Sequence, residues 1–549
     1  MIRLSLILLL VLATSASAQD EIDFGDVSEK HTMIPMRDGK KLSSYLYYPK
    51  GKGPWPVIFE QRYASLRGKG TRLGAAELAR SGYVVALVNY RGTHKSEGKW
   101  VGYRALQWGK LSDGYDTCEW LATRDWCTGK VGTFGSSQGG YAQNYLAVTQ
   151  PPHLTCQYMV DTGLSLFHEG YRIGGTTRPE RFKGMDGVCR NPKDNRELLA
   201  EWFSHPTYDD YWRDEDCTLH FDKMNVPCFT IGSWYDFMNQ GSIASYVGRQ
   251  HKGGGNSQNK QKLLIGPWLH GRTNKGSKVG ELTYPENASW GVHAHMIKWF
   301  DHYLKGKDNG VLDEPTVRYY VMGAVGEKGA PGNVWREADD FPPKIKYQPY
   351  YLRHGGELSQ AIPGRRETAS TYESDPLKPM SIPGRGFPGA RDARKFEEQS
   401  EVLTFTTEVL DKPVEWTGRA KAVLNVSSTA PDTDFIVRIS DVYPDGRSIL
   451  IVDYPLRARY REGFEKEVFM KPREVYTLKW DIGWMSQIFN KGHRIRVTVA
   501  STGAPLYEPN PQNGKPLTIE FPKDARKATN TIHHSRVHAS WIEAPMLAE

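Results

Sequence analysis

The most constraining feature of this sequence is a regular alternation of short apolar runs with helix-like stretches between about residues 57 and 304. Strands without polar alternation are typical of a parallel sheet that helices cover on both faces. Helix-like stretches such as 74–80 and 115–123 lie between the runs. This part of the chain is therefore predicted to be an α/β domain, with strand candidates at 57–59, 84–88, 132–134, 228–231 and 263–265.

The alternation lapses between about residues 151 and 224. This segment is rich in aromatic and charged residues and contains a helical stretch at 196–203. We expect it to form a helical cap over the carboxyl edge of the sheet. The α/β domain would then consist of residues 19–150 and 225–312.

From residue 313 to residue 549 the pattern becomes all-β. Turn chemistry at Tyr443-Pro444-Asp445-Gly446 separates two of the strand candidates. Short strands at this spacing favour a β-sandwich of the jelly-roll type. A long stretch rich in Pro, Gly and Arg, at 363–395, is expected to be a functional or disordered loop. The strand candidates are 401–407, 420–427, 435–439, 449–454, 475–480 and 495–499.

The first 18 residues have the form of a secretory signal rather than of a folded element. A basic residue, Arg3, precedes an apolar run at 4–12, and Ala16-Ser17-Ala18 has the pattern of a cleavage site. The apolar run is short for a membrane span, although an uncleaved anchor is the alternative. We expect a secreted or periplasmic protein that begins at Gln19 and has no stable membrane association after cleavage.

The six cysteines all lie in the first half of the chain, and export would place them where disulfides persist. Six cysteines allow 15 complete pairings, and their spacing alone does not select one of them. We predict the bridges Cys118–Cys127 and Cys189–Cys217. Cys156 and Cys228, which are near core strands, are expected to be buried free thiols. No Cys-x-x-Cys or His/Cys pairing indicates a metal site, and no cofactor is predicted.

The charge balance argues against a nucleic-acid partner. The 549 residues include 71 basic and 63 acidic side chains, which gives a formal net charge of +8. No long run of Lys or Arg is present, so the basic excess is mild and dispersed. The sequence does not specify an oligomeric state.

The strongest local signal is Gly135-Ser136-Ser137-Gln138-Gly139, which follows an apolar strand and precedes a helical stretch. A Gly-x-Ser-x-Gly sequence in that context is typical of a nucleophile elbow, where small flanking residues let the chain turn sharply and expose the serine. The backbone N–H of Gln138 would then face a developing oxyanion. The alternative is a glycine-rich turn without chemistry.

A nucleophilic serine needs a base, and the base needs a group that orients it. Hydrolases with this elbow place Asp and then His after Ser in the chain, at the ends of later strands. Asp236 follows the strand at 228–231, and His270 follows the strand at 263–265. We therefore predict a triad of Ser137, Asp236 and His270.

The same blocks carry a family resemblance that runs from about residue 30 to the C-terminus. The chain resembles the family of cocaine esterase, X-prolyl dipeptidyl peptidases, glutaryl cephalosporin acylases and α-amino acid ester hydrolases. Besides the elbow, the blocks are Asn89-Tyr90-Arg91-Gly92 with Ser96-Glu97-Gly98, Asp113-Gly114-Tyr115-Asp116 with Trp120, Trp234-Tyr235-Asp236, Gly266-Pro267-Trp268-x-His270 and Trp299-Phe300-Asp301-x-Tyr303-Leu304-Lys305-Gly306.

The resemblance implies an α/β-hydrolase domain, a helical cap and a C-terminal jelly-roll (galactose-binding-like) domain. It also implies that Ser137, Asp236 and His270 are the triad. Relatives use a tyrosine hydroxyl from the loop after the first core strand as an oxyanion donor. Glu60-Gln61-Arg62-Tyr63 occupies that place, so Tyr63 is expected to act with the Gln138 N–H.

One departure from the relatives concerns the substrate. The α-amino acid ester hydrolases carry acidic residues just after the triad aspartate, whereas Phe237-Met238-Asn239 stands here. Since a buried ammonium needs a paired charge, the missing acids argue against an amino-ester substrate. Acidic residues of the cap could supply the paired charge, but the favoured interpretation is that they are solvated charges. The cap aromatics could line an acyl pocket, but the favoured interpretation is that they hold the cap helices together. The acids are Glu169, Asp209 and Asp210; the apolar residues are Leu166, Phe167, Tyr171, Trp202 and Phe203.

The leading hypothesis is a serine hydrolase that cleaves a small-molecule ester, amide or peptide through an acyl-enzyme. An X-prolyl dipeptidyl peptidase is the alternative within the enzyme class. A catalytically inactive carbohydrate-binding protein is the alternative of another class. The presence of Ser137, Asp236, His270 and Tyr63 together argues against the inactive protein.

Overall fold

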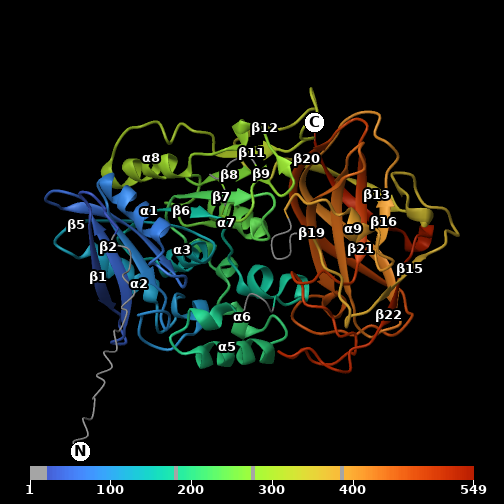
Figure 1. Ribbon diagram of the computed structural model, residues 1–549, viewed down its shortest axis with the longest axis horizontal. Coiled ribbons are helices and arrows are strands. Elements are labelled where there is room, and N and C mark those ends of the chain that lie inside the picture. The colour runs from blue at the N-terminus through green and yellow to red at the C-terminus, as the bar shows by residue number, and fades with distance from the viewer. Residues whose placement is uncertain (1–21, 179–183, 272, 274–277, 384–388, 549) are drawn as a thin grey trace, which may run out of the picture.

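The computed structural model describes residues 22–178, 184–271, 273, 278–383 and 389–548. The predicted secretory signal, with the expected mature N-terminus at Gln19, lies outside these residues. The chain forms two lobes that lie side by side, an α/β lobe (blue to green) and a β-rich lobe (orange to red) (Figure 1). Within the described part of the chain, no helix has the length and apolar character needed to cross a membrane.

A ten-stranded sheet forms the centre of the first lobe, in the order β1-β2-β4-β3-β5-β6-β7-β8-β11-β12. The strands from β4 to β11 in this order run parallel, whereas β1, β2 and β12 are antiparallel to their neighbours. The strands are β1 (Ser28–Pro35), β2 (Lys41–Tyr48), β3 (Trp55–Arg62), β4 (Val84–Asn89), β5 (Cys127–Ser136), β6 (Leu154–Val160), β7 (Cys228–Ser233), β8 (Lys262–Gly266), β11 (Val317–Val321) and β12 (Val334–Ala338). The predicted, mostly parallel α/β sheet is confirmed.

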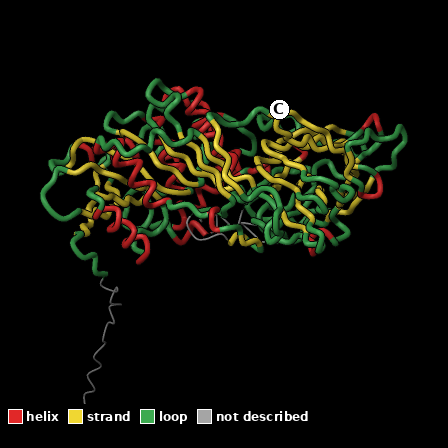
Figure 2. The backbone as a smooth tube through the Cα atoms, turned by 90° about the horizontal axis from the view of Figure 1, so that it is seen from above, coloured by secondary structure: helices red, strands yellow, loops and turns green. Residues whose placement is uncertain are grey.

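Helices cover both faces of this sheet, as Figure 2 shows from above. Helices α1 (Lys69–Arg80) and α8 (Val292–Lys305) pack on one face, with Trp299 and Phe300 of α8 in the core. Helices α2 (Asp113–Ala122), α3 (Gln138–Thr149) and α7 (Asn239–Lys252) pack on the other. The two-sided cover explains why the strands read as continuous apolar runs.

The cap begins later than expected, because residues 154–160 are not part of it. They form strand β6, which lies between β5 and β7 in the sheet. The helical pieces come after β6: the π-helix η2 (Leu166–Tyr171), the 3₁₀ turns η3 (Ile173–Gly175) and η4 (Gly184–Gly187), α5 (Pro192–Ser204), α6 (Asp210–Arg213), and the 3₁₀ turns η5 (Cys217–Leu219) and η6 (Phe221–Lys223). The cap therefore leaves the sheet after residue 160.

The second lobe consists of two antiparallel sheets with a common apolar core. Strands β11 and β12 extend the first sheet, so the antiparallel sheets begin only with β13. One sheet contains β13 (Ile345–Leu352), β14 (Leu358–Ser359), β15 (Ser370–Ser374), β17 (Val414–Ser428), β20 (Tyr476–Phe489), β22 (Ala528–Ile532) and β23 (Ser540–Leu547). The other contains β16 (Leu403–Thr406), β18 (Asp434–Val442), β19 (Ser448–Arg457) and β21 (Arg494–Ala500). The predicted β-rich C-terminal domain is confirmed, and the turn expected at 443–446 joins β18 to β19.

The predicted disulfides are wrong, because all six cysteines are free thiols. Cys118 lies within α2 and is buried against the sheet, while Cys127 is half-buried at the start of β5. Cys217 is buried in the cap core, and Cys189 lies in a loop whose backbone pairs with Thr93. Cys156 and Cys228 are buried free thiols, as expected.

A buried ion cluster joins the two lobes. The His493 imidazole lies 2.7 Å from Asp441 Oδ1 through Nδ1 and 2.9 Å from Glu327 Oε1 through Nε2. Glu327 belongs to the β11–β12 hairpin, whereas Asp441 lies on β18. Burial alone would lower the pKa of His493, but the bonds and charges of Asp441 and Glu327 raise the pKa above its ordinary value.

We expect His493→Gln to destabilise the protein, and to do so more at low pH than at high pH. Removing one partner of a buried ion pair costs about 3–5 kcal/mol. Because the folded-state pKa of His493 is raised, its contribution is complete below about pH 6.5 and is lost as pH rises through that folded-state pKa. Melting temperatures at pH 6 and pH 9 check this, with the exposed His354→Gln as control. An equal loss at both pH values would refute the assigned charge.

Candidate active site

Ser137 lies in the sharp turn that the sequence predicts between β5 and α3. Its φ and ψ are 57° and −113°, a region that a residue with a side chain rarely occupies. Gly135 has a φ of 140°, and a Cβ atom there would meet Glu60 Cγ at 3.0 Å. At Gly139, a Cβ atom would lie 3.1 Å from Glu60 Oε1. The φ of Gly135 therefore favours glycine, and any larger residue at Gly139 would have to displace the Glu60 side chain.

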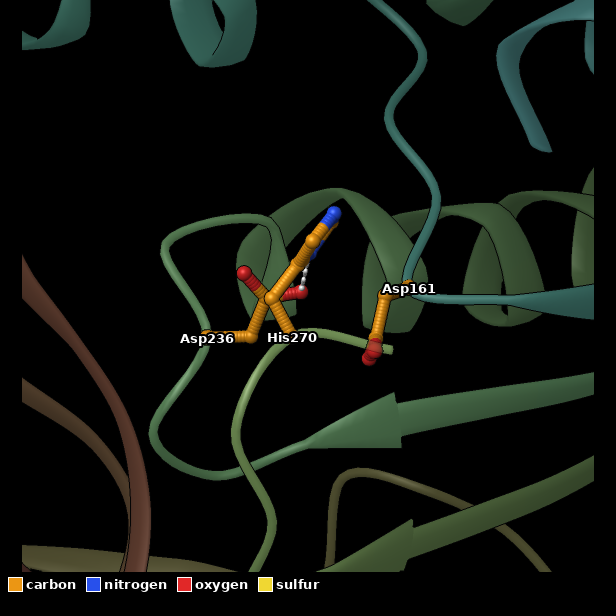
Figure 3. Close-up of side chains that lie close together, drawn as sticks. All are labelled: Asp161, Asp236 and His270. Atoms are coloured by element: carbon orange, nitrogen blue, oxygen red, sulfur yellow. Dashed lines mark hydrogen bonds and ion pairs between the residues drawn. The ribbon is translucent and has the colours of Figure 1, made fainter. Parts of the chain in front are cut away.

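The two other predicted triad residues are in direct contact. His270 Nδ1 lies 2.9 Å from Asp236 Oδ2, as the dashed line in Figure 3 shows. The side chain of Asp236 is fully buried, and that of His270 is 18% exposed. A buried carboxylate at Nδ1 favours the tautomer with the proton there, which leaves Nε2 as a proton acceptor. The Phe237 ring stacks on the imidazole with a centroid distance of 5.5 Å.

A third residue, Asp161, belongs to this cluster and was not predicted. It follows β6, and its Oδ2 accepts a 2.6 Å hydrogen bond from the N–H of Gly271. Ligand-type atoms of Asp161, Asp236 and His270 all lie within 4.8 Å of one another (Figure 3). Burial, with a smaller contribution from the Asp236 charge, raises the pKa of Asp161 to about 7.

The same cluster has the composition of a metal-ligand set, with two carboxylates and one imidazole. However, the hydrogen bond to Gly271 already engages Asp161 Oδ2, and the His270 contact engages Asp236 Oδ2. A metal ion bound through His270 Nδ1 would have to break the contact with Asp236. The arrangement is better suited to orienting an imidazole base.

Gln138 connects the elbow to the loop that carries Tyr63. As the first residue of α3, Gln138 has a backbone N–H that no helical carbonyl accepts. Its side-chain Oε1 accepts hydrogen bonds from the N–H groups of Tyr63 and Ala64, at 2.8 and 2.9 Å. This side-chain contact was not predicted. It places the backbone of the proposed hydroxyl donor beside the elbow.

The Tyr63 ring is half-buried and stands edge-on to three other aromatic rings, at centroid distances of 5.8, 5.9 and 6.2 Å. The rings are those of Tyr90, Trp100 and Tyr103. The Tyr63 carbonyl lies 2.9 Å from His94 Nε2. Tyr63 is therefore held through both its ring and its main chain.

The acidic residues of the cap are engaged in structural contacts. Glu169 is half-buried and accepts a 2.6 Å hydrogen bond from the N–H of Leu164, and desolvation raises its pKa to about 7. Asp209 lies 2.6 Å from His205 Nδ1, and the exposed Asp210 pairs with Arg213. Most of the cap aromatics and Leu166 lie in an apolar core, which agrees with a structural role for Leu166, Phe167, Tyr171 and Trp202.

The loop that carries Asp236 packs against the second lobe. A cavity of about 60 Å³ separates residues 234–240 from strands β19 and β20. Beside the cavity, Arg419 of β17 donates a 2.7 Å hydrogen bond to Gln240 Oε1. The second lobe thus forms a wall behind the acid of the predicted triad.

Comparison with known proteins agrees with this architecture. Residues 38–272 match the family model for the X-Pro dipeptidyl-peptidase (S15 family). Residues 309–543 match the X-Pro dipeptidyl-peptidase C-terminal non-catalytic domain. The cocaine esterase of Rhodococcus sp. (strain MB1 Bresler) is 30% identical over 94% of this chain and 98% of its own length. A putative serine esterase of Mycobacterium bovis is 25% identical over 94% of each chain.

Solved structures show the same fold over nearly the whole chain. An α-amino acid ester hydrolase superposes with a TM-score of 0.84 at 24% identity, over 97% of this chain and all of that chain. An aminopeptidase from a marine sediment Thaumarchaeota archaeon superposes with a TM-score of 0.83 at 25% identity, over 96% of this chain and 97% of its own. The chain therefore belongs to the X-Pro dipeptidyl-peptidase (S15) family, and it is an enzyme of the serine hydrolase class.

Proposed function

We propose that this protein is an exported, secreted or periplasmic esterase or acylase that works through a covalent acyl-enzyme on Ser137. The observation that carries the proposal is the strained turn at Ser137 on the same sheet edge as the Asp236–His270 pair. Parallel strands bring their carboxyl ends to one edge, and β5, β7 and β8 supply the three residues there. The signal-like residues 1–18 support the exported location.

The chemistry follows from these positions. His270 Nε2 takes the Ser137 proton as Oγ attacks the substrate carbonyl, and Asp236 stabilises the resulting imidazolium. The Gln138 N–H and the Tyr63 hydroxyl donate to the oxyanion of the tetrahedral intermediate. Collapse of the tetrahedral intermediate expels the leaving group, which takes its proton from His270. Water, activated by the same histidine, then hydrolyses the acyl-enzyme and restores Ser137.

The engaged acids favour a substrate without a free ammonium group. An X-prolyl dipeptidyl peptidase has to recognise the amino terminus of a peptide, which calls for an available carboxylate. Glu169 and Asp209 hold groups of the protein itself, and Asp210 pairs with Arg213. Neutral esters and amides of small molecules are therefore the preferred substrate class.

A fluorophosphonate probe tests the nucleophile, and a substrate panel tests the class. We expect labelling of one serine, identified as Ser137 by peptide mapping. Turnover of p-nitrophenyl acyl esters should exceed turnover of Gly-Pro and Ala-Pro anilides. Absence of labelling in folded protein would favour the inactive carbohydrate-binding alternative, and preference for the anilides would favour the dipeptidyl peptidase.

The pH dependence should report the histidine base. His270 must be neutral to accept the Ser137 proton, and an unperturbed imidazole loses its proton near pH 6.5. We expect kcat/KM for a p-nitrophenyl ester to rise between pH 5 and pH 8 and then level. Two esters with different leaving groups, measured in parallel, control for a binding-limited rate. A flat profile with both esters would exclude a histidine base.

A further inference from the structure

Asp161 contacts the backbone on both sides of the predicted Ser–His pair. Its carbonyl oxygen accepts a 3.1 Å hydrogen bond from the N–H of Ser137. Its carboxylate accepts the 2.6 Å hydrogen bond from Gly271, the residue directly after His270. One residue therefore fixes the main chain of the nucleophile and the main chain of the base.

The local backbone of Asp161 is consistent with such a role. Its φ is 48°, in the left-handed region that residues with side chains rarely adopt. Strand β6 ends at Val160, whose carbonyl also accepts the Ser137 N–H, at 3.0 Å. The change of direction after Val160 turns the carboxylate of Asp161 towards the loops that follow β7 and β8. Strained conformations of this kind persist where surrounding contacts enforce them.

We propose that Asp161 is a positioning residue that sets the placement of His270 relative to Ser137 and, through its charge, the basicity of His270. This inference rests on the proposed triad. The hydrogen bond to Gly271 governs the placement, because it anchors the residue next to the base. The charge acts across the cluster, because the ligand-type atoms of Asp161 and His270 lie within 4.8 Å of each other.

The charge of Asp161 is expected to favour the protonated imidazole of His270. The groups that face the Asp161 carboxyl are Asp236, His270, the Gly271 N–H and the Ser233 hydroxyl. Burial, followed by the Asp236 charge, raises the pKa of Asp161 to about 7, so it changes charge in the range where His270 must be neutral. A second negative charge beside the imidazole favours its protonated form and raises its pKa.

Two substitutions separate placement from charge. Asp161→Ala removes the acceptor for Gly271, and we expect kcat to fall at least about tenfold, since small displacements of reacting groups are costly in rate. KM should change little, because no substrate contact is removed. Asp161→Asn keeps an acceptor for Gly271 but has no charge. Its kcat at the pH plateau should stay within about threefold of wild type, while kcat/KM should reach that plateau at lower pH than in wild type, with the difference confined to about pH 7 and above, where Asp161 is charged.

Glu169→Gln is the matched control. Glu169 is half-buried, and like Asp161 it is a carboxylate that accepts a main-chain N–H and has a pKa near 7, but its charged neighbours are Asp216 and Arg419. Its pH profile should match wild type. If Asp161→Ala keeps wild-type kcat, or if Asp161→Asn keeps the wild-type profile, the inference is wrong. If Asp161→Ala does not fold, the profile of Asp161→Asn decides alone. Undiminished turnover by Ser137→Ala would instead remove the proposed triad itself.

Discussion

Ser137→Ala is expected to lower ester hydrolysis by at least about three orders of magnitude while the fold stays intact. The substitution removes one hydroxyl oxygen from a half-buried turn, so the free energy of unfolding should change by about 0.5 kcal/mol or less. No acyl-enzyme can form without that oxygen, and the remaining groups only bind and polarise the substrate. Steady-state rates on a p-nitrophenyl ester, with melting temperature as the folding check, measure both effects.

Ser136→Ala is the matched control, because Ser136 is the neighbouring serine at the end of β5 and is also half-buried. It should retain most of the wild-type rate and react fully with a fluorophosphonate. Retention of a tenth of the wild-type rate by Ser137→Ala would remove Ser137 as nucleophile. Loss of activity in Ser136→Ala alone would move the nucleophile by one residue.

Tyr63→Phe is expected to reduce ester turnover at least about fiftyfold. Losing one oxyanion donor typically costs about 10²–10³ in kcat, or roughly 2.7–4 kcal/mol. A donor that acts mainly on the tetrahedral intermediate stabilises the transition state more than bound substrate, so kcat should fall more than KM rises. The ring contacts with Tyr90, Trp100 and Tyr103 remain, which should preserve the fold.

Tyr48→Phe provides the comparison, since Tyr48 is another half-buried tyrosine and packs edge-on against Trp126. It should leave kcat unchanged. The Tyr63→Phe protein should still react, slowly, with a fluorophosphonate, because the nucleophile and base are intact. A near-normal kcat in Tyr63→Phe would show that the second oxyanion donor is another group.

The core strands were predictable where burial on both faces made them uniformly apolar, as in β4 and β7. Strand β6 was not predicted because it contains Gln157, a fully buried polar residue. The Gln157 amide donates to Thr133 Oγ1 at 3.1 Å and to the carbonyl of Gln143 at 2.8 Å. Those partners lie 24 and 14 residues away, so no local pattern shows that the amide is satisfied in the sheet.

Candidate site residues could be predicted only where the strand before them was predicted. Asp236 and His270 followed recognised strands, whereas Asp161 followed the strand that was missed. The apolar pair Met159-Val160, directly before Asp161, was the sequence signal that could have indicated the end of this strand. The Gln138–Tyr63 contact spans 75 residues and follows from the fold rather than from spacing. The cysteine pairings failed for a related reason, since sequence distance does not show that Cys118 faces the sheet.

The wall that β19 and β20 form behind the Asp236 loop has a consequence for how such proteins can diversify. Val452 and Trp484 line the same cavity as Asp236, although they belong to the other lobe. An exchange of C-terminal halves between relatives would therefore place foreign side chains against the loop that carries Asp236. We therefore expect chimeras that join the N-terminal half of this chain to the C-terminal half of a relative to lose activity, even when both parent proteins are active.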